Sequence, residues 1–393
     1  MRLAERQQRL DCLLPTFHEL WHPQPFRESR PAWCDQYPAL AAELLALPDD
    51  ELARLSGDDG AARIWLSRHI PGLTDLDALV ALPERRAATS PPLGSAWAWE
   101  IPGRKQRQIE AFAAAARSAG PATLVDWCGG KGHLGRLLAM QWRVAVDTLE
   151  IDPQLCAAGE LLADRARAMQ KFSCRDALTA GDVLAGVGQA VALHACGDLH
   201  RSLVRQGSAA GVGRLDIAPC CYHRGVGDYY RPLSGALETC LTRDDTRLAV
   251  TETVTASPRL TRQRDKEMAW KLGFDTWRRA EGGVGEYRPF KPVPAVWFRG
   301  DFAGFIERLA QREGLAFAGA VRVAEFEARG WQRQRELLRL SVLRHVFRRP
   351  LEIWLALDLA VYLESRGYAV ALGRFCERQL TPRNLLISAV RAA

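Results

Sequence analysis

Cysteine, histidine and aspartate side chains gather in two short stretches of the sequence, LHACGDLH at 193–200 and APCCYH at 218–223. Thiols, imidazoles and carboxylates are the groups that act as nucleophiles, general bases or metal ligands. The candidate catalytic residues are His223, Asp198, Cys196, Cys220 and Cys221. His223 or Asp198 could take a proton from a hydroxyl or an amine. The cysteines could add to a pyrimidine ring, or they could only pack a cleft.

Metal binding is a further use of such residues, but their spacing matches no known zinc pattern. The sequence also contains no C-x-x-C pair, which is typical of zinc ribbons. We therefore expect no metal. The ten cysteines are scattered rather than arranged as a disulfide framework, which favours reduced thiols in a cytoplasmic protein.

A glycine-rich stretch, DWCGGKGHLGR, begins at Asp126 and reads as the end of a strand, a tight turn and the start of a helix. Gly130, Gly132 and Gly135 satisfy the dinucleotide pattern G-x-G-x-x-G. Asp126, Gly130 and Gly132 also fit the looser methyltransferase loop, acidic-x-G-x-G-x-G, with Cys128 where a glycine is usual. No glycine stands five residues before the Gly-Lys pair, which excludes a P-loop.

An acidic pair, Glu150 and Asp152, ends the next expected strand about 20 residues after the loop. An acid at this place suits the ribose hydroxyls of a dinucleotide or of S-adenosyl-L-methionine. The loop and the acid together indicate an adenosine-containing cofactor, without choosing between these two. A strand–helix turn that holds no ligand is the alternative.

The elements that must position these residues are expected to form a doubly wound α/β sheet. From residue 104, helical and strand patterns alternate, as in a parallel sheet with crossover helices. We expect an N-terminal helical domain at 1–92 and a sheet domain at 100–393. The latter would carry an insertion at 225–345 and complete its sheet with 350–391.

Ligands of such sheets bind beyond the carboxyl ends of the strands, so the glycine loop and both cysteine-containing stretches should meet at one rim. Hydride transfer has no need of thiols there, which favours methyl transfer. The arginine-rich stretch RGWQRQRELLRLSVLRHVFRR is interpreted as a packed helix with a solvated face rather than as a nucleic-acid contact.

Three stretches in this order and spacing, DWCGGKGHLGR, LHACGDL and APCCYH, resemble one branch of the class I S-adenosylmethionine-dependent methyltransferases, with a Gly-Lys-Gly loop and a Pro-Cys-Cys-Tyr motif. The branch includes animal methyltransferase-like proteins and the glutathione S-transferase C-terminal-domain-containing protein. More distantly, the chain resembles the tRNA acceptor-stem 2'-O-methyltransferase. GRKQRQIEAFA is similar to the lead-in helix of the family and LTPRNLLISAVR to its terminal segment, so the resemblance spans roughly 100–391.

The resemblance implies a Rossmann-like methyltransferase sheet and S-adenosyl-L-methionine as cofactor. The cofactor-binding residues expected on this basis are Asp126, Cys128, Gly130, Gly132, Glu150, Asp152, Asp182 and His194. Asp126, Gly130 and Gly132 would frame the methionine part. Glu150 would bind the ribose, and Asp182 would approach the adenine amine.

Two loop positions carry separate expectations. A Cβ at Cys128 is compatible with the loop only if its backbone dihedral angles are ordinary. Gly135, once the dinucleotide reading is set aside, is expected to be a helix-packing residue.

The net charge of +7 favours an acidic partner, so we expect RNA, perhaps tRNA, as methyl acceptor, with protein the other candidate. The sequence has no run of about 18 apolar residues and its start lacks the features of a signal peptide, so we expect no membrane span and a cytoplasmic location. Two alternatives stay open: a NAD(P)-linked oxidoreductase, and a catalytically degenerate methyltransferase fold that binds RNA or protein.

Overall fold

The computed structural model describes residues 1–85, 93, 97–116, 120, 123–252, 257–317 and 322–392. The predicted domain boundary at residue 92 and the final residue, 393, lie outside these ranges. The chain divides into two compact units. Unit 1 comprises Met1–Thr16, Asp75–Thr255 and Arg348–Ala393, and unit 2 comprises Phe17–Thr74 and Ala256–Phe347.

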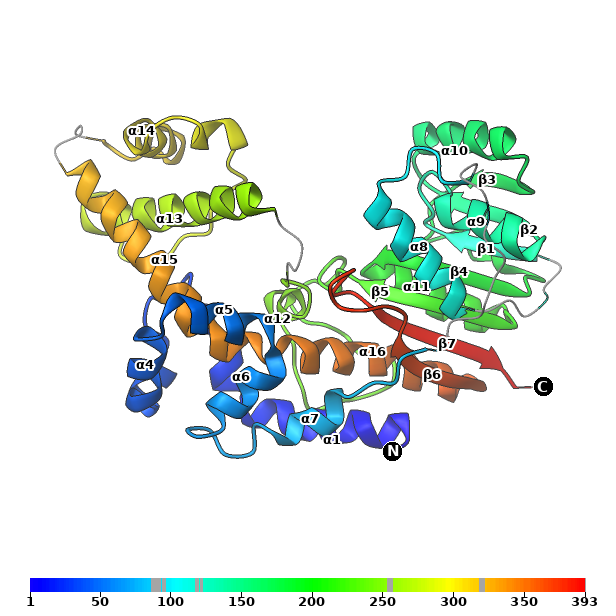
Figure 1. Ribbon diagram of the computed structural model, residues 1–393, viewed down its shortest axis with the longest axis horizontal. Helices are drawn as coiled ribbons and strands as arrows, with labels where there is room; N and C mark the ends of the chain where they lie inside the picture. Colours follow the sequence, from blue (N-terminus) through cyan, green and yellow to red (C-terminus); the bar gives the residue numbers. More distant parts are fainter. Residues whose placement is uncertain are drawn as a thin grey trace. The chain divides into compact units, whose positions relative to one another are not determined.

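A seven-stranded sheet organises the described part of unit 1, with the strand order β3-β2-β1-β4-β5-β7-β6 (Figure 1). The strands are β1 (Thr123–Trp127), β2 (Ala145–Glu150), β3 (Gln170–Cys174), β4 (Gln189–Cys196), β5 (Arg214–Cys220), β6 (Tyr368–Arg374) and β7 (Leu385–Arg391). The first five strands are parallel, whereas β7 runs antiparallel to both β5 and β6. The predicted doubly wound α/β sheet, resumed at the C-terminus, is confirmed.

The helices of unit 1 connect and cover this sheet. They are α1 (Leu3–Thr16), α7 (Asp75–Val80), α8 (Gly103–Ala116), α9 (His133–Trp142), α10 (Pro153–Ala166), the 3-10 helix η2 (Gly181–Leu184), α11 (Asp198–Ala209), α12 (Arg243–Leu248) and α16 (Arg348–Ser365). Helices α8 and α9 share one apolar cluster with the sheet, in which Phe112 and Leu137 join Leu124 of β1 and Val191 of β4. This cluster fixes the two helices that flank the glycine loop.

Unit 2 is helical in the part that the structure describes. Its helices are α2 (His18–Trp21), α3 (Trp33–Gln36), α4 (Pro38–Leu45), α5 (Asp49–Gly57), α6 (Asp59–Leu66), α13 (Pro258–Ala280), the 3-10 helix η3 (Ala295–Phe298), α14 (Phe302–Glu313) and α15 (Val323–His345). Buried aromatic rings such as Trp270, Phe302 and Phe305 form its core.

The arginine-rich stretch lies largely in α15, so the helix predicted there is confirmed. Two of its arginines are less solvated than expected. Arg333 Nη1 lies 3.0 Å from the buried carboxylate of Asp275, and Arg339 pairs with Asp49 at 2.7 Å. These ion pairs join α15 to other helices of unit 2.

The chain segments that make up the two compact units do not end at the predicted domain boundaries. Helix α1 packs with α16 in unit 1, because buried Asp11 accepts hydrogen bonds from Trp354 Nε1 at 2.9 Å and from the backbone N–H of Glu238 and Thr239. The segment predicted as one insertion is also divided, since residues 225–252 stay with unit 1. Among the described helices, none has the length and apolar character needed to cross a bilayer.

Candidate cofactor site and thiol cluster

The glycine loop joins β1 to α9 through three left-handed residues. Cys128, Gly130 and Gly132 have φ angles of 57°, 60° and 61°, and the N–H of Gly132 closes the turn on the carbonyl of Gly129 at 3.0 Å. The condition stated from the sequence, that a Cβ at Cys128 requires ordinary dihedral angles, therefore does not hold, because Cys128 carries its Cβ in the left-handed conformation. A left-handed non-glycine residue costs about 1–3 kcal/mol and persists only where its surroundings enforce it.

Gly129 is a loop position without room for a side chain, as Gly132 is, although the sequence patterns did not single out Gly129. A Cβ there would stand 2.5 Å from Asp126 Oδ2 and 2.6 Å from Thr148 Cγ2. At Gly130, by contrast, a Cβ would have no atom of the described residues within 4 Å, its two chain neighbours aside. The backbone at Gly130 is therefore open, so a ligand can approach it closely.

Asp126 lies beneath the loop and is buried. Its Oδ2 accepts a hydrogen bond of 2.9 Å from the N–H of Gly135, one of the first-turn donors of α9 that have no partner within the helix. Burial raises the pKa of this carboxyl to about 7, although the Gly135 hydrogen bond and Lys105 act in the opposite direction. Asp126 thus anchors the start of α9.

Gly135 is a packing residue, as expected. A Cβ there would lie 2.6 Å from Gln170 Nε2 and 2.8 Å from Thr148 Oγ1. The same Gln170 amide donates to the carbonyl of Gly132 at 2.9 Å. The glycine at position 135 therefore lets α9 approach the sheet, which is a requirement unrelated to a dinucleotide.

Glu150 ends β2 with its carboxylate against the glycine loop. Oε2 accepts a hydrogen bond of 3.0 Å from the N–H of Gly130, and Oε1 accepts from the N–H groups of Ile151 and Asp152. Asp152 itself is the N-cap of α10 and accepts from the N–H of Gln154 at 2.8 Å. The structure thus gives Asp152 a capping contact and leaves Glu150 as the acid that touches the loop.

Asp182 lies apart from these residues on η2, with an exposed side chain. Arg175 forms two hydrogen bonds with its carboxylate, at 2.7 and 2.9 Å. This guanidinium holds the pKa of Asp182 below its ordinary value. Contact of Asp182 with an adenine amine stays a prediction.

A cavity of about 580 Å³ opens beside the loop, at the carboxyl ends of β1 and β4. Of the residues expected to bind the cofactor, Asp126, Cys128, Gly130 and His194 line it. Parallel-sheet proteins bind ligands at this place.

The cavity also has cationic lining residues that the sequence reasoning did not name as site residues, Arg104 and Lys105 of α8. The signal for them was available, because both lie in the stretch GRKQRQIEAFA. His133 lines the cavity as well, and its Nδ1 accepts a hydrogen bond of 2.8 Å from Arg136. Burial, followed by the charge of Arg136, lowers the pKa of His133 to about 4.

His194 stands where β4 departs from regular pairing. The register with β5 shifts between Leu193 and Cys196, and His194 adopts a left-handed φ of 64°. Burial, together with the charge of Arg383, lowers its pKa to about 4, so the ring is neutral near pH 7. Its buried Nδ1 has no hydrogen-bond partner within the described structure.

Arg383 and Asn384 follow β6 and precede β7. The Nδ2 of Asn384 donates to the carbonyl of Cys376 at 2.7 Å, and Arg383 donates to the carbonyl of Val250. Both side chains therefore hold backbone segments together, and the positive charge of Arg383 also contributes to the lowered pKa of His194.

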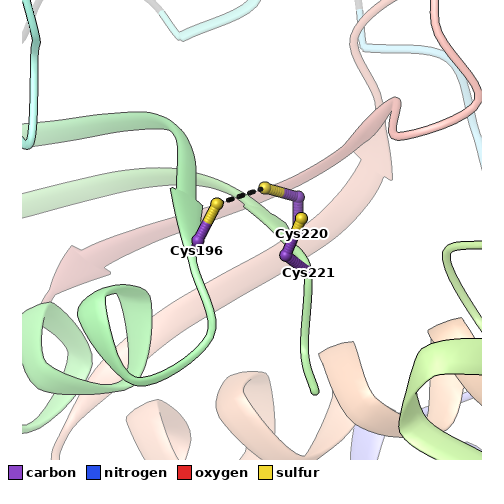
Figure 2. Close-up of side chains that lie close together, drawn as sticks. All are labelled: Cys196, Cys220 and Cys221. Carbon is purple, nitrogen blue, oxygen red and sulfur yellow. Dashed lines mark hydrogen bonds between the residues drawn. The ribbon is translucent and has the colours of Figure 1, made fainter. Parts of the chain in front are cut away.

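Cys196, Cys220 and Cys221 form a thiol cluster at the ends of β4 and β5 (Figure 2). Cys196 and Cys220 are direct partners across the two strands, with their sulfurs 3.7 Å apart, and all three sulfurs lie within 4.8 Å of one another. Hydrogen bonding with Cys196 and then with Cys220 lowers the pKa of Cys221. Corresponding contacts with Cys196 and Cys221 raise the pKa of Cys220.

The rim predicted to gather all these residues is divided, since Asp198 lines a second cavity of about 450 Å³ and not the first. The turn at Gly197 separates them. Gly197 has a φ of 54° and donates to the carbonyl of Cys220 at 3.0 Å. Asp198 begins α11 beyond this turn and pairs with Arg201 at 3.4 Å. His223 lines neither cavity, and burial lowers its pKa.

Comparison with known proteins adds one family match. Residues 104–225 match a protein-family model described as a methyltransferase domain. No curated protein matches the sequence significantly.

Several solved structures of methyltransferases are similar in part. The methyltransferase domain of bacterial CtHen1 shares 11% identity, with 29% of this chain and 65% of that one covered at a TM-score of 0.26. An O-methyltransferase family protein from Burkholderia thailandensis shares 11% identity, with 76% of this chain and 62% of that one covered at a TM-score of 0.31. Cyclopropane synthase MmaA2 from Mycobacterium tuberculosis shares 13% identity, with 73% of this chain and 82% of that one covered at a TM-score of 0.26.

The chain spans less than two-thirds of the length of the first two structures, and TM-scores this low support no conclusion about shared function. The family match covers β1 to β5 together with α8 to α11, which are the elements that carry the loop, Glu150 and the thiol cluster. Unit 1 therefore has a Rossmann-like methyltransferase fold, and residues 104–225 are similar to a methyltransferase domain.

Proposed function

We propose that this protein is an S-adenosylmethionine-dependent methyltransferase. The observation that carries the proposal is the contact between Glu150 and the N–H of Gly130, beside the cavity of the loop and within the segment that matches a methyltransferase domain. Oε1 of Glu150 already accepts two backbone N–H groups and Oε2 accepts one, which leaves Oε2 able to accept a hydrogen bond from a ribose hydroxyl.

The residues of the cavity fit the rest of the cofactor. Gly130 leaves open space for a close backbone approach, and Arg104 and Lys105 supply positive charge for an amino-acid carboxylate. When bound, S-adenosylmethionine supplies an electrophilic methyl group on its sulfonium sulfur. The neutral ring of His194, with an unpartnered Nδ1, can accept a hydrogen bond from the group that receives the methyl.

The chain's own contribution to the reaction would be mainly geometric. Methyl transfer is an in-line displacement, so the nucleophile must be held on the line of the breaking bond. The lowered pKa of His194 makes the ring a weak base at neutral pH. We therefore assign it to orienting the acceptor, with proton removal by His223 or Asp198 kept as the earlier prediction.

The sheet order disfavours the oxidoreductase alternative. Dinucleotide-binding sheets of the Rossmann type have the order 3-2-1-4-5-6, whereas here the antiparallel β7 lies between β5 and β6. The glycine that completed the dinucleotide pattern, Gly135, also has a packing reason of its own.

The acceptor is proposed to be RNA, with tRNA the first candidate and protein the second. The net charge of +7 supports this choice. The second cavity also has three arginines in its lining, Arg201, Arg205 and Arg231, alongside Asp198 and Asp228.

Calorimetry tests the cofactor. Binding of S-adenosylhomocysteine without binding of NADH is expected. Glu150→Gln should weaken binding about 10- to 150-fold, because a hydrogen bond to a charged group contributes about 1.5–3 kcal/mol. The matched control, Glu160→Gln on the exposed side of α10, should bind as the wild type does. Heat with NADH alone, or equal affinity in both variants, would sink the assignment.

Incubation with tritiated cofactor and cell extract tests the acceptor. The label should be released by ribonuclease and resist protease. Label lost only to protease would point to a protein acceptor. Cofactor binding without transfer to any fraction would instead support a fold that has kept only its binding role.

A further inference from the structure

We propose that Cys196, Cys220 and Cys221 bind one zinc ion through their three thiolates. Zinc prefers sulfur and nitrogen ligands in tetrahedral geometry, and these three sulfurs already lie within 4.8 Å of one another. The inference concerns metal binding only, so it does not depend on the proposed methyl transfer.

The spacing of the sulfurs fits the ion. Zinc–sulfur bonds of about 2.3 Å at tetrahedral angles place two ligand sulfurs about 3.8 Å apart. The sulfurs of Cys196 and Cys220 are 3.7 Å apart. The sulfur of Cys221, in the residue after β5 (Figure 2), lies within 4.8 Å of the other two, so it must approach each by at most about 1 Å to reach the same separation.

The surrounding backbone holds the cluster in place. The N–H of Gly197 donates to the carbonyl of Cys220 at 3.0 Å, and the N–H of Arg224 donates to the carbonyl of Cys221 at 2.9 Å. The first bond ties the turn after β4 to the end of β5, and the second closes the turn after β5. The ligands are thus pre-positioned by the sheet, which reduces the ordering cost of binding.

Residue spacing did not predict this site, because the three cysteines do not follow a known zinc pattern. Cys196 is 24 residues from Cys220, and only the pairing of β4 with β5 brings them together. The expectation of no metal rested on spacing alone. Geometry in the folded chain is the more direct evidence.

The three sulfurs leave one position of a tetrahedron for water or another small ligand. Cys220 is buried, whereas Cys196 and Cys221 are partly exposed, so an ion can reach the cluster from solvent. A zinc ion with three thiolates has a net charge of −1, and the guanidinium of Arg224 supplies a positive charge nearby. Each thiol that is still protonated loses its proton to solvent as its zinc–sulfur bond forms, and no electron is transferred.

Metal titration of the full chain tests the site. The protein, kept reduced and freed of metal with a chelator, would be titrated with Co²⁺ and then with Zn²⁺. We expect one Co²⁺ per chain, with the strong near-ultraviolet absorption of thiolate-to-cobalt charge transfer, and its loss when Zn²⁺ displaces Co²⁺. Absence of metal binding, or cobalt bound without thiolate absorption, would overturn the proposal.

Single substitutions locate the ligands. Cys196→Ala, Cys220→Ala and Cys221→Ala should each weaken Zn²⁺ binding at least about 100-fold. Cys376→Ala, which removes a buried thiol outside the cluster, should bind Zn²⁺ as the wild type does. Unchanged affinity in any of the three cluster variants would contradict the assignment of that residue, and unchanged affinity in all three would end the proposal.

Alkylation of the wild-type chain provides a test that does not require folded variants. Zn²⁺ should slow iodoacetamide labelling of Cys196 and Cys221 at least tenfold and leave the exposed Cys240 unaffected, as read by peptide mass spectrometry. Equal labelling with and without Zn²⁺ would refute the site. A disulfide between Cys196 and Cys220 that persists under reducing conditions would also refute it.

Discussion

Replacing Asp126 with asparagine should change the stability of the protein in a way that depends on pH. The carboxyl of Asp126 is 1% exposed and accepts the N–H of Gly135 at 2.9 Å. An amide of nearly the same shape keeps an acceptor for this N–H but cannot ionise. The two proteins therefore differ by a constant amount plus the ionisation free energy of one buried group.

The sign and size of the effect follow from the raised pKa. Asp126 has a pKa of about 7 in the folded chain against an ordinary value of 3.8. Because the folded pKa is the higher one, the contribution of the carboxyl is fully present below pH 4 and is lost as the pH rises to about 7. The total loss in the free energy of unfolding of the wild type is about 4 kcal/mol, and about 3 kcal/mol of it occurs between pH 5 and pH 8.

Urea unfolding of the full chain, followed by circular dichroism at pH 5, 6, 7 and 8, measures this difference. The free energy of unfolding of Asp126→Asn should rise relative to the wild type by about 3 kcal/mol across that range. Asp164→Asn, which removes an exposed carboxylate from α10, is the matched control for the loss of one negative charge. A difference between Asp126→Asn and the wild type that stays constant with pH would refute the reasoning.

Two further substitutions test how the core supports the site. Gly135→Ala should lower the free energy of unfolding by about 1–3 kcal/mol, because its Cβ would meet Gln170 and Thr148. Calorimetry should also show that this variant binds S-adenosylhomocysteine more weakly. Unchanged stability would contradict the close packing at position 135. Tyr230→Phe should cost about 1–3 kcal/mol in urea unfolding, because the hydroxyl donates to the buried carboxylate of Asp358 at 2.7 Å, and an effect near zero would mean that this hydrogen bond adds no net stability.

The central strands of the sheet could be predicted from the sequence because they are buried on both faces. Ala190, Val191 and Ala192 of β4 are all fully buried, and such strands read as continuous apolar runs between helical patterns. The loop after β1 and the acid after β2 follow from that alternation, so their meeting at one edge was also predictable. The contact of Glu150 with Gly130 is its direct consequence.

The compact units could not be predicted in the same way. Helix α1 is amphipathic like the helices that follow it, and its sequence does not say which partner covers its apolar face. The buried bonds of Asp11 to Trp354 and to the backbone near Thr239 join segments more than 200 residues apart. Such pairing depends on three-dimensional packing, which local periodicity does not encode.

Left-handed backbone angles at non-glycine residues could not be predicted from the sequence either. Glycine patterns identify positions where a left-handed conformation costs little free energy, but they do not indicate that a cysteine or a histidine adopts this conformation. The structure has φ angles of 57° at Cys128, 64° at His194 and 46° at Cys221. The first follows β1, the second lies near the end of β4 and the third follows β5.

These three positions belong to neighbouring strands, since β1 pairs with β4 and β4 with β5. Each would cost less free energy as glycine, and each instead carries a thiol or an imidazole. Strain of about 1–3 kcal/mol per residue is tolerated where the surrounding structure enforces it, and it concentrates at functional sites. Cys128 and His194 line the cavity beside the glycine loop, and Cys221 belongs to the thiol cluster. Among the described residues, Glu100, Arg143 and Arg167 also have a positive φ, and Arg143 and Arg167 do so as the C-caps of α9 and α10, where a left-handed residue is common. Cys128, His194 and Cys221 cap no helix, which supports the view that this edge of the sheet is kept for chemistry rather than for stability.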